Sequence, residues 1–380
     1  MAPVKIMSVF GTRPEAIKMA PLVNELKKYP ESITPLVAVT AQHREMLDQV
    51  LSIFEINPDY DLNIMKSKQS LVDITTRALN GLDEIMKKEK PDLVLVHGDT
   101  TTTFAASLAA FYNQVAVGHV EAGLRSHNKM SPFPEEMNRM LTGVLADLNF
   151  APTVRAYDNL SNEGKNTESI YVTGNTAIDA LKNTVRSDYS HPILNEIYGK
   201  RMILLTSHRR ENHGEPMENI FRAVKRIVND HEDVHVVFPV HLNPLIRKLA
   251  DEVLGGHSRV HLTEPLDVID FHNFASRATL ILTDSGGVQE EAPSLGVPVL
   301  VLRENTERPE GVSAGTLKLI GTNEENIYSS ASMLLTNSEE YTQMSKASNP
   351  YGDGQASKRI VEAILYYFGE STSKPDPFIE

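Results

Sequence analysis

The feature that most constrains the fold of this chain is a repeated alternation of short apolar runs and helical patterns. Val4–Phe10, Pro91–Val96 and Val115–Val120 are apolar runs with β-branched residues, as expected for strands buried on both faces of a sheet. Helical patterns lie between such runs, for example at 71–88 and 101–112. Repeated strand–loop–helix units predict a parallel sheet with helices on both faces.

The same rhythm returns in the second half of the chain. Five apolar runs predict a second sheet, namely Arg201–Thr206, Val234–Phe238, Val260–Leu262, Leu280–Leu282 and Pro298–Val301. We therefore expect an α/β protein of two doubly wound, Rossmann-like domains, at residues 1–173 and 174–356. Residues 357–380, which include most of a final helix, are expected to pack back on the first domain. The segment 184–200 is expected to be irregular, and the tail 371–380 to be frayed.

Composition excludes several classes of function. The net charge is -13, so a nucleic acid is not an expected partner, and an anionic substrate has to be bound by local Arg, Lys and His side chains. The chain contains no cysteine, which excludes disulfides, thiolate metal sites and a cysteine nucleophile. No signal peptide and no apolar run of membrane-spanning length is recognised, so a cytoplasmic protein without a membrane partner is expected.

A glycine turn follows one predicted strand of the second half. The stretch Thr283–Glu291 reads Thr-Asp-Ser-Gly-Gly-Val-Gln-Glu-Glu and leads into a short helix. Its two glycines let backbone N–H groups approach an anion, and the helix dipole favours negative charge at the same place. Glu290 or Glu291 can bond the hydroxyls of a ribose, so the stretch predicts a nucleotide site. An ordinary strand-to-helix turn, with both glutamates as dipole partners, explains the same pattern.

Basic side chains follow the first predicted strand of each half, where ligands of doubly wound sheets bind. The guanidinium of Arg13 and the ammonium of Lys18 suit phosphate oxygens. His208, with Arg209 beside it, can shuttle a proton. The alternatives are that Lys18 is a solvated helix residue and that the loop at His208 is a solvated turn. His241 fits a polar lining and the edge of a core equally well.

Three acidic residues each follow a predicted strand or a proline break, namely Asp99, Glu121 and Glu135. If these acids converge, their repulsion keeps one of them protonated, which supplies an acid and a base together. Alternatively, Asp99 caps a helix, Glu121 bonds backbone, and Glu135 complements a helix dipole. The chain has no G-x-G-x-x-G, no P-loop motif and no H-E-x-x-H, so neither a redox cofactor nor a bound metal is implied.

Seven motifs occur in one order along the chain and together carry a resemblance that none of them carries alone. They are GTRPEAIKMAP (Gly11–Pro21), HGDTTTT (His97–Thr103), HVEAGLRS (His119–Ser126), PFPEEMNR (Pro132–Arg139), SHRREN (Ser207–Asn212), DSGGVQEEAPSLG (Asp284–Gly296) and ERPEG (Glu307–Gly311). In this order they resemble the non-hydrolysing UDP-N-acetylglucosamine 2-epimerases of bacteria. The resemblance runs from Val4 to about Arg359.

The resemblance implies a glycosyltransferase-B-like fold with the active site in the cleft between the halves. It implies interconversion of UDP-N-acetylglucosamine (UDP-GlcNAc) and UDP-N-acetylmannosamine (UDP-ManNAc) without cofactor or metal. Because the C2 proton of the sugar is not next to a carbonyl, the family eliminates UDP from C1 as that proton leaves. UDP then adds back to a 2-acetamidoglucal intermediate. This chemistry needs a stabilised diphosphate and acid/base groups on both faces of C2.

The resemblance also assigns site residues, position by position. The implied catalytic residues are Asp99, Glu121, Glu135 and His208, and the implied substrate-binding residues are Arg13, Lys18, Phe271, Ser285, Gly286, Gly287, Glu291 and Arg308. Among the latter, Ser285 and Gly286 would hold phosphate, Glu291 the ribose and Phe271 the uracil ring. Asp99 and Glu121 are both candidates for removing the C2 proton, and the choice between them stays open.

Regulation and assembly are implied as well. Some family members bind a second UDP-GlcNAc as an allosteric activator, and the matching residues here are Gln42, Gln69, Arg209 and His241, with Lys68 where close relatives are expected to have arginine. A homodimer and a role in teichoic acid or surface polysaccharide synthesis are expected. Three other functions stay open: a hydrolysing epimerase, a glycosyltransferase of the same architecture, and a non-catalytic nucleotide-sugar sensor.

Overall fold

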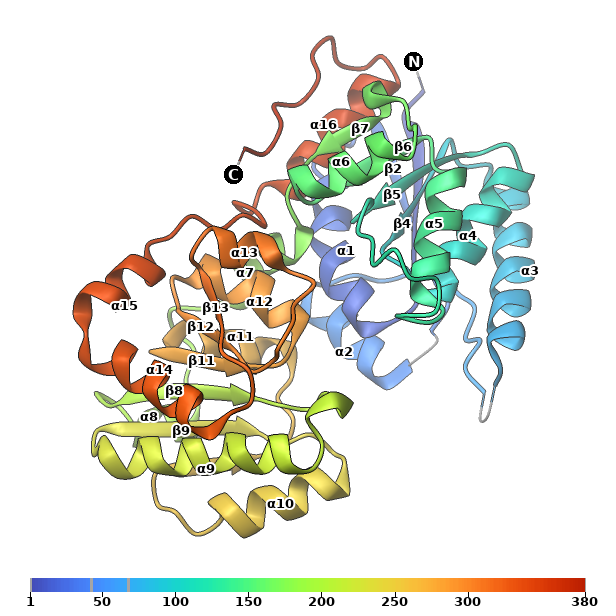
Figure 1. The fold of residues 1–380 in the computed structure, drawn as a ribbon. Coiled ribbons are helices and arrows are strands. Elements are labelled where there is room, and N and C mark those ends of the chain that lie inside the picture. Colours follow the sequence, from blue (N-terminus) through green and yellow to red (C-terminus); the bar gives the residue numbers. More distant parts are fainter. Residues whose placement is uncertain (1, 42–43, 67–68, 380) are drawn as a thin grey trace. The chain divides into compact units, whose positions relative to one another are not determined.

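The computed structural model describes residues 2–41, 44–66 and 69–379, without the side chains of residues 44–46. Contacts within the chain divide it into two units, which can be followed by colour in Figure 1. The first unit comprises Met1–Asn183 and Tyr351–Glu380, and the second is the continuous segment Thr184–Pro350. The first unit therefore contains both ends of the chain.

A seven-stranded parallel sheet forms the centre of the first unit. Its strands are β1 (Val4–Phe10), β2 (Ile33–Val39), β3 (Tyr60–Asp61), β4 (Leu93–His97), β5 (Ala116–Val120), β6 (Leu148–Ala151) and β7 (Ile170–Val172). They lie in the order β3-β2-β1-β4-β5-β6-β7. β1 pairs with β2 on one side and with β4 on the other, so the winding of the chain reverses between β1 and β4. Ligands of doubly wound sheets bind beyond the strand ends at such a switch point.

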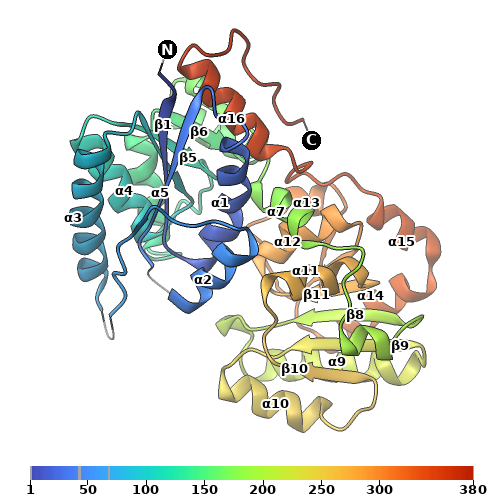
Figure 2. The same cartoon turned by 180° about the vertical axis from the view of Figure 1, so that it is seen from behind.

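Helices cover both faces of this sheet. They are α1 (Arg13–Leu26), α2 (Arg44–Ile53), α3 (Leu71–Glu89), α4 (Thr101–Tyr112), α5 (Glu135–Leu145), α6 (Val154–Asn162), α7 (Thr176–Thr184) and α16 (Ala356–Tyr367), with a 3-10 turn at Thr167–Ser169. Neighbouring residues of β1 point to opposite faces, so Ile6 packs in the cluster of α1, α2 and α16, and Met7 in the cluster of α3 and α4. Figure 2 shows α16 beside α1. The last helix of the chain thus completes the core of the first unit.

The second unit is built on a six-stranded parallel sheet. Its strands are β8 (Arg201–Thr206), β9 (Val234–Pro239), β10 (Val260–Thr263), β11 (Leu280–Thr283), β12 (Val299–Val301) and β13 (Leu317–Leu319). Their order is β10-β9-β8-β11-β12-β13, which puts the switch point between β8 and β11. Both sheets are thus doubly wound, and the predicted fold class is confirmed.

The helices of the second unit also lie on both faces of its sheet. They are α8 (Pro192–Glu196), α9 (Glu215–Asp230), α10 (Pro244–Leu254), α11 (Val268–Arg277), α12 (Gly286–Glu291), α13 (Pro309–Ser313), α14 (Glu324–Thr336) and α15 (Ser338–Ser345), with 3-10 turns at Arg210–Asn212 and Ala292–Leu295. One core cluster contains residues of α9, α10 and α14, and the other contains residues of α11 and α12. Strands such as β8 contribute to both clusters, which explains why their sequences are apolar without alternation.

The unit boundaries differ from those expected at 173/174 and 356/357. Residues 174–183 and 351–356 belong to the first unit. The buried carboxylate of Asp179 in α7 accepts hydrogen bonds from the N–H groups of Ala356 (3.2 Å) and Ser357 (2.8 Å), which ties the two segments together.

Two further sequence expectations are wrong. The segment 184–200 contains α8, and the tail is anchored because Phe378 is buried and donates its backbone N–H to the carbonyl of Val172 (2.8 Å). The sequence pattern also does not predict the short edge strands β3 and β13. Within the described part of the chain, no helix has both the length and the apolar composition needed to cross a bilayer.

Candidate functional site

The loops at the first switch point are joined by one buried carboxylate, that of Glu15. Its Oε2 accepts hydrogen bonds from the backbone N–H groups of Gly11 (3.0 Å) and Thr12 (2.8 Å), which follow β1. Its Oε1 accepts from the hydroxyls of Thr100 (2.7 Å) and Thr103 (3.2 Å), which follow β4. Burial raises the pKa of Glu15 above its usual value, although these partners oppose the shift. Glu15 therefore sets the spacing between the loop before Arg13 and the loop that carries Asp99.

Asp99 is held from the side of α5. Its carboxylate forms an ion pair with the guanidinium of Arg139 (2.6 Å), and its backbone carbonyl accepts a hydrogen bond from the amide of Asn138 (2.9 Å). The capping function expected as an alternative belongs to the next residue, because the hydroxyl of Thr100 accepts from the N–H of Thr103 at the start of α4. Asp99 itself is half-buried, so its position at the strand end is compatible with contact to a ligand.

Glu121 lies at the end of β5 in the left-handed region, with φ of +62°. Its carboxylate forms an ion pair with Lys18 of α1 and accepts a hydrogen bond from the amide of Asn175 (3.1 Å). Nε2 of the buried His97 lies 3.7 Å from the same carboxylate oxygen. A non-glycine residue in this conformation carries strain that recurs at functional sites. The structure thus brings together Lys18 and Glu121, two of the residues predicted from the sequence.

Two buried histidines lie beside these acids. Burial lowers the pKa of His97 to about 3 and that of His119 to about 4. Nε2 of His119 is hydrogen-bonded to the carbonyl of Gly98 (2.7 Å). Both imidazoles are therefore neutral at pH 7, and they leave the acids to interact with Lys18 and Arg139.

Glu135 is the first residue of α5 and is half-buried, whereas the next residue, Glu136, is fully buried. The carboxylate of Glu136 accepts hydrogen bonds from the backbone N–H groups of Ser126 (3.0 Å) and His127 (2.9 Å), and from Arg139 (2.9 Å). Burial acts to raise the pKa of Glu136, but these donors outweigh it and hold the pKa below its usual value. Glu136 is a structural acid that fixes the loop before α5, and it leaves Glu135 as the site candidate on this helix.

At the second switch point, β8 and β11 end in register, because Thr206 is paired with Thr283. The residue directly after β11, Asp284, is fully buried. Its Oδ2 accepts four hydrogen bonds from the loop after β8, whose donors are the hydroxyl of Ser207 (3.1 Å), the backbone N–H groups of His208 (2.9 Å) and Arg209 (3.0 Å), and the amide of Asn212 (3.0 Å). One carboxylate oxygen thus holds the whole basic loop.

His208 projects from this loop and is partly exposed. Its Nδ1 lies 3.3 Å from Oδ1 of Asp284, and its ring is stacked on that of His241, with the centroids 5.7 Å apart. Burial lowers the pKa of His208; Asp284 opposes this shift, and Arg209 and His241 add to it. His208 and His241 are therefore neighbours in the second unit, as the idea of a polar lining requires.

Two guanidinium groups lie beside the glycine turn. A Cβ placed on Gly286 would be 3.8 Å from a terminal nitrogen of both Arg209 and Arg308. Ser285 precedes the first turn of α12, and its backbone N–H bonds the hydroxyl of Thr283 (2.9 Å). Two fixed positive charges next to a residue without a side chain form a place where an anion can approach the backbone. Phosphate binding at this turn stays a prediction.

The two glutamates of α12 have different partners. Glu290 is buried and forms an ion pair with Arg308, so it orients that guanidinium. Glu291 lies 3.3 Å from Nε2 of the buried His272, a residue that sequence reasoning does not single out. Phe271, the residue before it, is half-buried and packs on the core cluster of α11 and α12. Phe271 thus directly precedes the histidine whose ring lies beside Glu291.

The four residues assigned to an activator lie in different parts of the chain. Gln42 falls outside the described residues, as does Lys68, the residue before Gln69. Gln69 belongs to the first unit and accepts a hydrogen bond from the backbone N–H of Lys66 (3.1 Å). Arg209 and His241 belong to the second unit, both beside His208. Within the second unit the structure brings Arg209 and His241 together.

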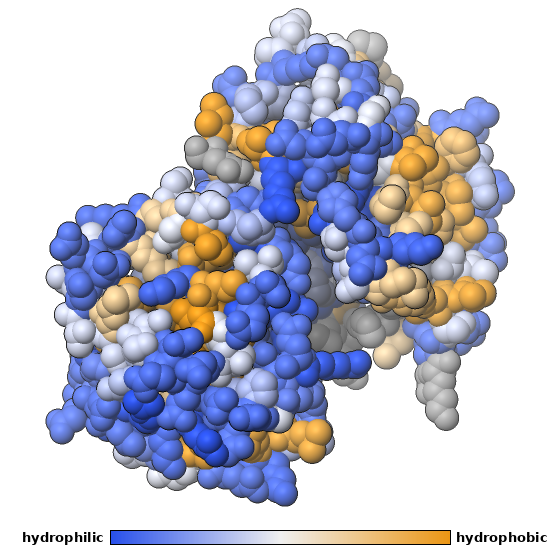
Figure 3. Space-filling view, in the orientation of Figure 1, coloured by the Kyte–Doolittle hydropathy of each residue, from blue (hydrophilic) through white to orange (hydrophobic). Residues whose placement is uncertain are grey.

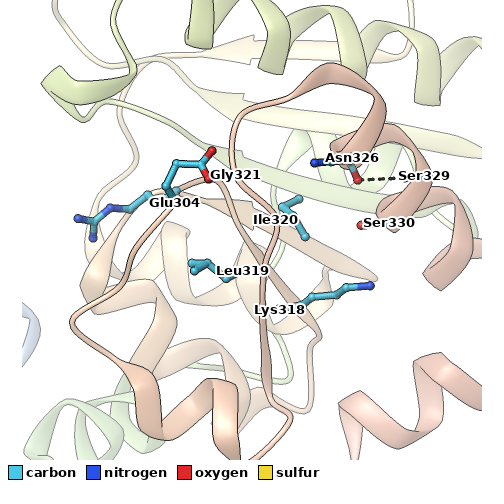
Figure 4. A pocket seen from close by; sticks show the side chains of 9 residues that line it. Glu304, Lys318, Leu319, Ile320, Gly321, Asn326, Ser329 and Ser330 are labelled. Atoms are coloured by element: carbon cyan, nitrogen blue, oxygen red, sulfur yellow. Dashed lines mark hydrogen bonds between the residues drawn. The ribbon is translucent and has the colours of Figure 1, made fainter.

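The cavity shown in Figure 4, of about 360 Å³, lies elsewhere in the second unit. It is lined by the segment 318–321, by α14 and by residues after β12, and Glu304 and Lys318 are among its charged side chains. None of the nine described residues that line it is a predicted site residue. Among the described residues, no three His, Asp or Glu side chains are placed to share a metal ion.

Known proteins match this chain along almost its whole length. The family described as UDP-N-acetylglucosamine 2-epimerase matches residues 24–365. The chain belongs to this family. A UDP-N-acetylglucosamine 2-epimerase of Bacillus subtilis (strain 168) is 68% identical over 378 residues, which cover 100% of this chain and 99% of the relative.

Solved structures of UDP-N-acetylglucosamine 2-epimerases have the same fold. A crystal structure from Listeria monocytogenes assigned to this activity has a TM-score of 0.96 and 60% identity, and each chain is covered completely (100%). The enzyme of Neisseria meningitidis, solved with UDP-GlcNAc bound, has a TM-score of 0.86 and 51% identity over 96% of this chain and 100% of that chain. The chain is therefore a member of a family of epimerases, which are isomerases.

Proposed function

We propose that this protein interconverts UDP-GlcNAc and UDP-ManNAc without hydrolysis, by elimination and re-addition of UDP. The observation that supports the proposal is the kind of charged group that lies at each switch point. Acids paired with cations lie at the end of the first sheet, and guanidinium groups surround a glycine turn at the end of the second. The relative from Neisseria meningitidis binds UDP-GlcNAc, which has both a C2 hydrogen and a diphosphate.

The first unit is proposed to handle the proton. As the C2–H bond breaks, the C1–O bond to UDP also breaks, which gives 2-acetamidoglucal and free UDP in the site. A carboxylate must take the proton, and another group must return one to the opposite face of C2. Asp99 and Glu121 are the candidates, since each is held in place by an ion pair, with Arg139 and Lys18 respectively. Glu135 remains a third candidate at the start of α5.

The second unit is proposed to hold UDP. Arg308 and the backbone at Ser285 and Gly286 would stabilise the departing diphosphate, whose negative charge grows as the C1–O bond breaks. The backbone N–H of His208 bonds Asp284, the residue before Ser285, and the imidazole of His208 would contact a phosphate oxygen. Glu291 and Phe271 are proposed for the ribose and the uracil. Gly287 would leave room for the ligand, and Arg13 of the first unit would add a further guanidinium.

Heavy-water exchange tests this function. The protein is incubated with UDP-GlcNAc in D2O and followed by proton NMR, and we expect deuterium at C2 of both UDP-GlcNAc and UDP-ManNAc. Free N-acetylmannosamine as the main product would favour the hydrolysing alternative. Sugar transfer to an added acceptor without C2 exchange would favour a glycosyltransferase. Tight binding of UDP-GlcNAc that stays chemically unchanged would favour the non-catalytic nucleotide-sugar sensor.

A homodimer is proposed from the surface of the first unit. Large apolar side chains are exposed on three neighbouring helices, namely Leu71 and Val72 of α3, Phe111 and Tyr112 of α4, and Met140, Leu141 and Val144 of α5. Figure 3 shows apolar side chains gathered over these helices. An exposed patch of this kind supports a protein interface. Sedimentation at micromolar concentration is expected to give a dimer, and Val144→Glu a monomer.

The activator role also stays a proposal. Arg209 and His241 would contribute to binding a second UDP-GlcNAc, together with Gln42 and Gln69. Sigmoidal dependence of the rate on substrate, made hyperbolic by Gln69→Ala, would support it, and a hyperbolic curve for the unmodified protein would refute it. Cytoplasmic location and a role in teichoic acid synthesis stay predictions.

A further inference from the structure

Asp284 has two carboxylate oxygens with different surroundings. Oδ2 accepts four hydrogen bonds from residues 207–212, as described above. Among the described residues no hydrogen bond reaches Oδ1, although it is buried, and the imidazole Nδ1 of His208 lies 3.3 Å from it. A buried carboxylate oxygen without a donor is costly, so an N–H group on Nδ1 is strongly favoured at this distance.

We propose that Asp284 is a positioning residue that keeps a proton on Nδ1 of His208, so that Nε2 is the nitrogen that takes up a proton and donates it to a diphosphate oxygen of the ligand. The two ring nitrogens of a histidine are distinct, and the partner of one sets the state of the other. Among the residues that the structure describes, the titratable and charged groups recorded beside His208 are Asp284, Arg209 and His241, and Asp284 is the anion that can accept a hydrogen bond from its imidazole. This inference rests on the proposed function, in which His208 contacts the diphosphate.

The same carboxylate thereby performs two tasks. Oδ2 fixes the backbone of the loop, and Oδ1 fixes the tautomer of the side chain that the loop presents. The two tasks can be separated by Asp284→Asn. The carbonyl oxygen of asparagine still accepts the four donors of the loop, whereas its NH2 group then faces Nδ1 of His208. Nδ1 must accept this bond, so the proton of the neutral imidazole moves to Nε2.

The experiment compares Asp284→Asn with Asp284→Ala and with a matched control. Asp233→Asn also removes a carboxylate from the second unit, but at the opposite end of β8, where Asp233 pairs with Arg201. For each variant we measure Tm, kcat, KM and the pH profile of kcat. For 15N-histidine-labelled protein at pH 8 we record the 15N shifts of His208, which is assigned from the signal lost in His208→Gln.

We expect Asp284→Asn to retain its Tm within a few degrees while kcat falls by about a hundredfold, a typical loss for a misplaced acid–base group. The 15N shifts should change from the Nδ1–H to the Nε2–H pattern, and the acidic limb of the pH profile should move lower because a negative charge is lost. Asp284→Ala should lower Tm as well, and Asp233→Asn should leave kcat and the pH profile unchanged. In a His208→Ala background, Asp284→Asn should add less than a threefold further loss.

Two outcomes overturn the inference. One is an Asp284→Asn protein with unchanged 15N shifts of His208, and the other is a full additional loss of kcat in the His208→Ala background. The tautomer measurement does not require turnover. A tautomer change in a protein that catalyses no C2 exchange would therefore leave the role of Asp284 intact and refute the proposed function alone.

Discussion

Each sheet has a buried carboxylate at its switch point, and the two carboxylates are used differently. Glu15 joins the loops after β1 and β4, and both of its oxygens accept hydrogen bonds from backbone or threonine. Asp284 joins the loops after β8 and β11, and one of its oxygens faces an imidazole. In each sheet an internal acceptor thus joins the two loops of the switch point. Of these two acceptors, Asp284 is the one that is also proposed to set the tautomer of a neighbouring histidine, His208.

The largest effect is expected for Glu121→Gln, which tests whether the two units have different roles. If proton transfer belongs to the first unit, this variant should lose about a thousandfold in kcat and in C2 deuterium exchange, because a positioned general acid or base contributes about that factor. UDP binding by the second unit, measured by titration calorimetry, should stay within about twofold. Glu168→Gln, which alters an exposed pair with Lys374, is the matched control. Loss of UDP binding in Glu121→Gln would remove the division of labour between the units.

Arg308→Ala tests the opposite assignment. The affinity for UDP should fall by about tenfold to a hundredfold, the worth of a charge-assisted hydrogen bond. Arg308→Lys should recover part of it, since it keeps the charge beside Glu290 but not the planar fork. The exposed Arg222 of α9 provides the control, Arg222→Ala. Equal affinities in all four proteins would show that the glycine turn does not bind the diphosphate.

The first unit should be the more acid-sensitive of the two. His97 and His119 are neutral in the folded state down to pH values of about 3 and 4, whereas in the unfolded chain they bind protons below about pH 6.5. Their contribution to stability is thus complete above about pH 6.5 and is lost as the pH falls towards 4, by up to about 1.4 kcal/mol per pH unit for each histidine. The raised pKa of Glu15 and of Asp179 has the opposite sign and offsets part of this loss.

Hydrogen exchange of peptides from each unit, recorded at pH 7 and pH 5, checks this prediction. Protection should fall more in β4 and β5 than in β8 and β11, and His97→Asn should reduce the difference. If both units lose protection equally, the acid sensitivity does not come from the two buried histidines.

The smallest effect is expected at Glu15. Glu15→Gln keeps an oxygen for the N–H groups of Gly11 and Thr12 and offers an NH2 group to the threonine hydroxyls, so kcat should fall by less than about threefold. Glu15→Asp is one methylene too short to join both loops and should lose about tenfold. Ile364→Ala, a cavity in the same unit but in α16, controls for lost stability. A larger loss for Gln than for Asp would mean that Glu15 acts through its charge.

Local patterns predict most of the fold, because strands and helices in doubly wound sheets follow from short-range periodicity. The helix expected at 101–112 has those limits in the structure, and the strand expected at Val115–Val120 is Ala116–Val120. β3 has only two residues and leaves no periodic signal. The boundary between the units could not be read from composition, since it depends on the bonds of Asp179 to residues 356 and 357.

The sequence motifs predict which residues belong to the candidate site, but not which hydrogen-bond partners each of them has. Glu15 and Asp284 lie inside the recognised motifs, yet their bonds reach loops that are distant in the sequence, up to 88 residues away for Glu15 and Thr103. Which of two adjacent acids is buried, Glu135 or Glu136, depends on the loop at Ser126 and not on the helix itself. Long-range hydrogen bonds, unlike periodicity, leave no trace in a single sequence.

The return of the chain to its first unit has a consequence for biosynthesis. Residues of α16 contribute Ile360, Val361 and Ile364 to the core around α1, so this core is incomplete until the last segment has left the ribosome. The second unit is continuous and ends at Pro350. The part of the protein translated first is therefore the part that finishes folding last, and it has to wait, partly assembled, while the later part matures.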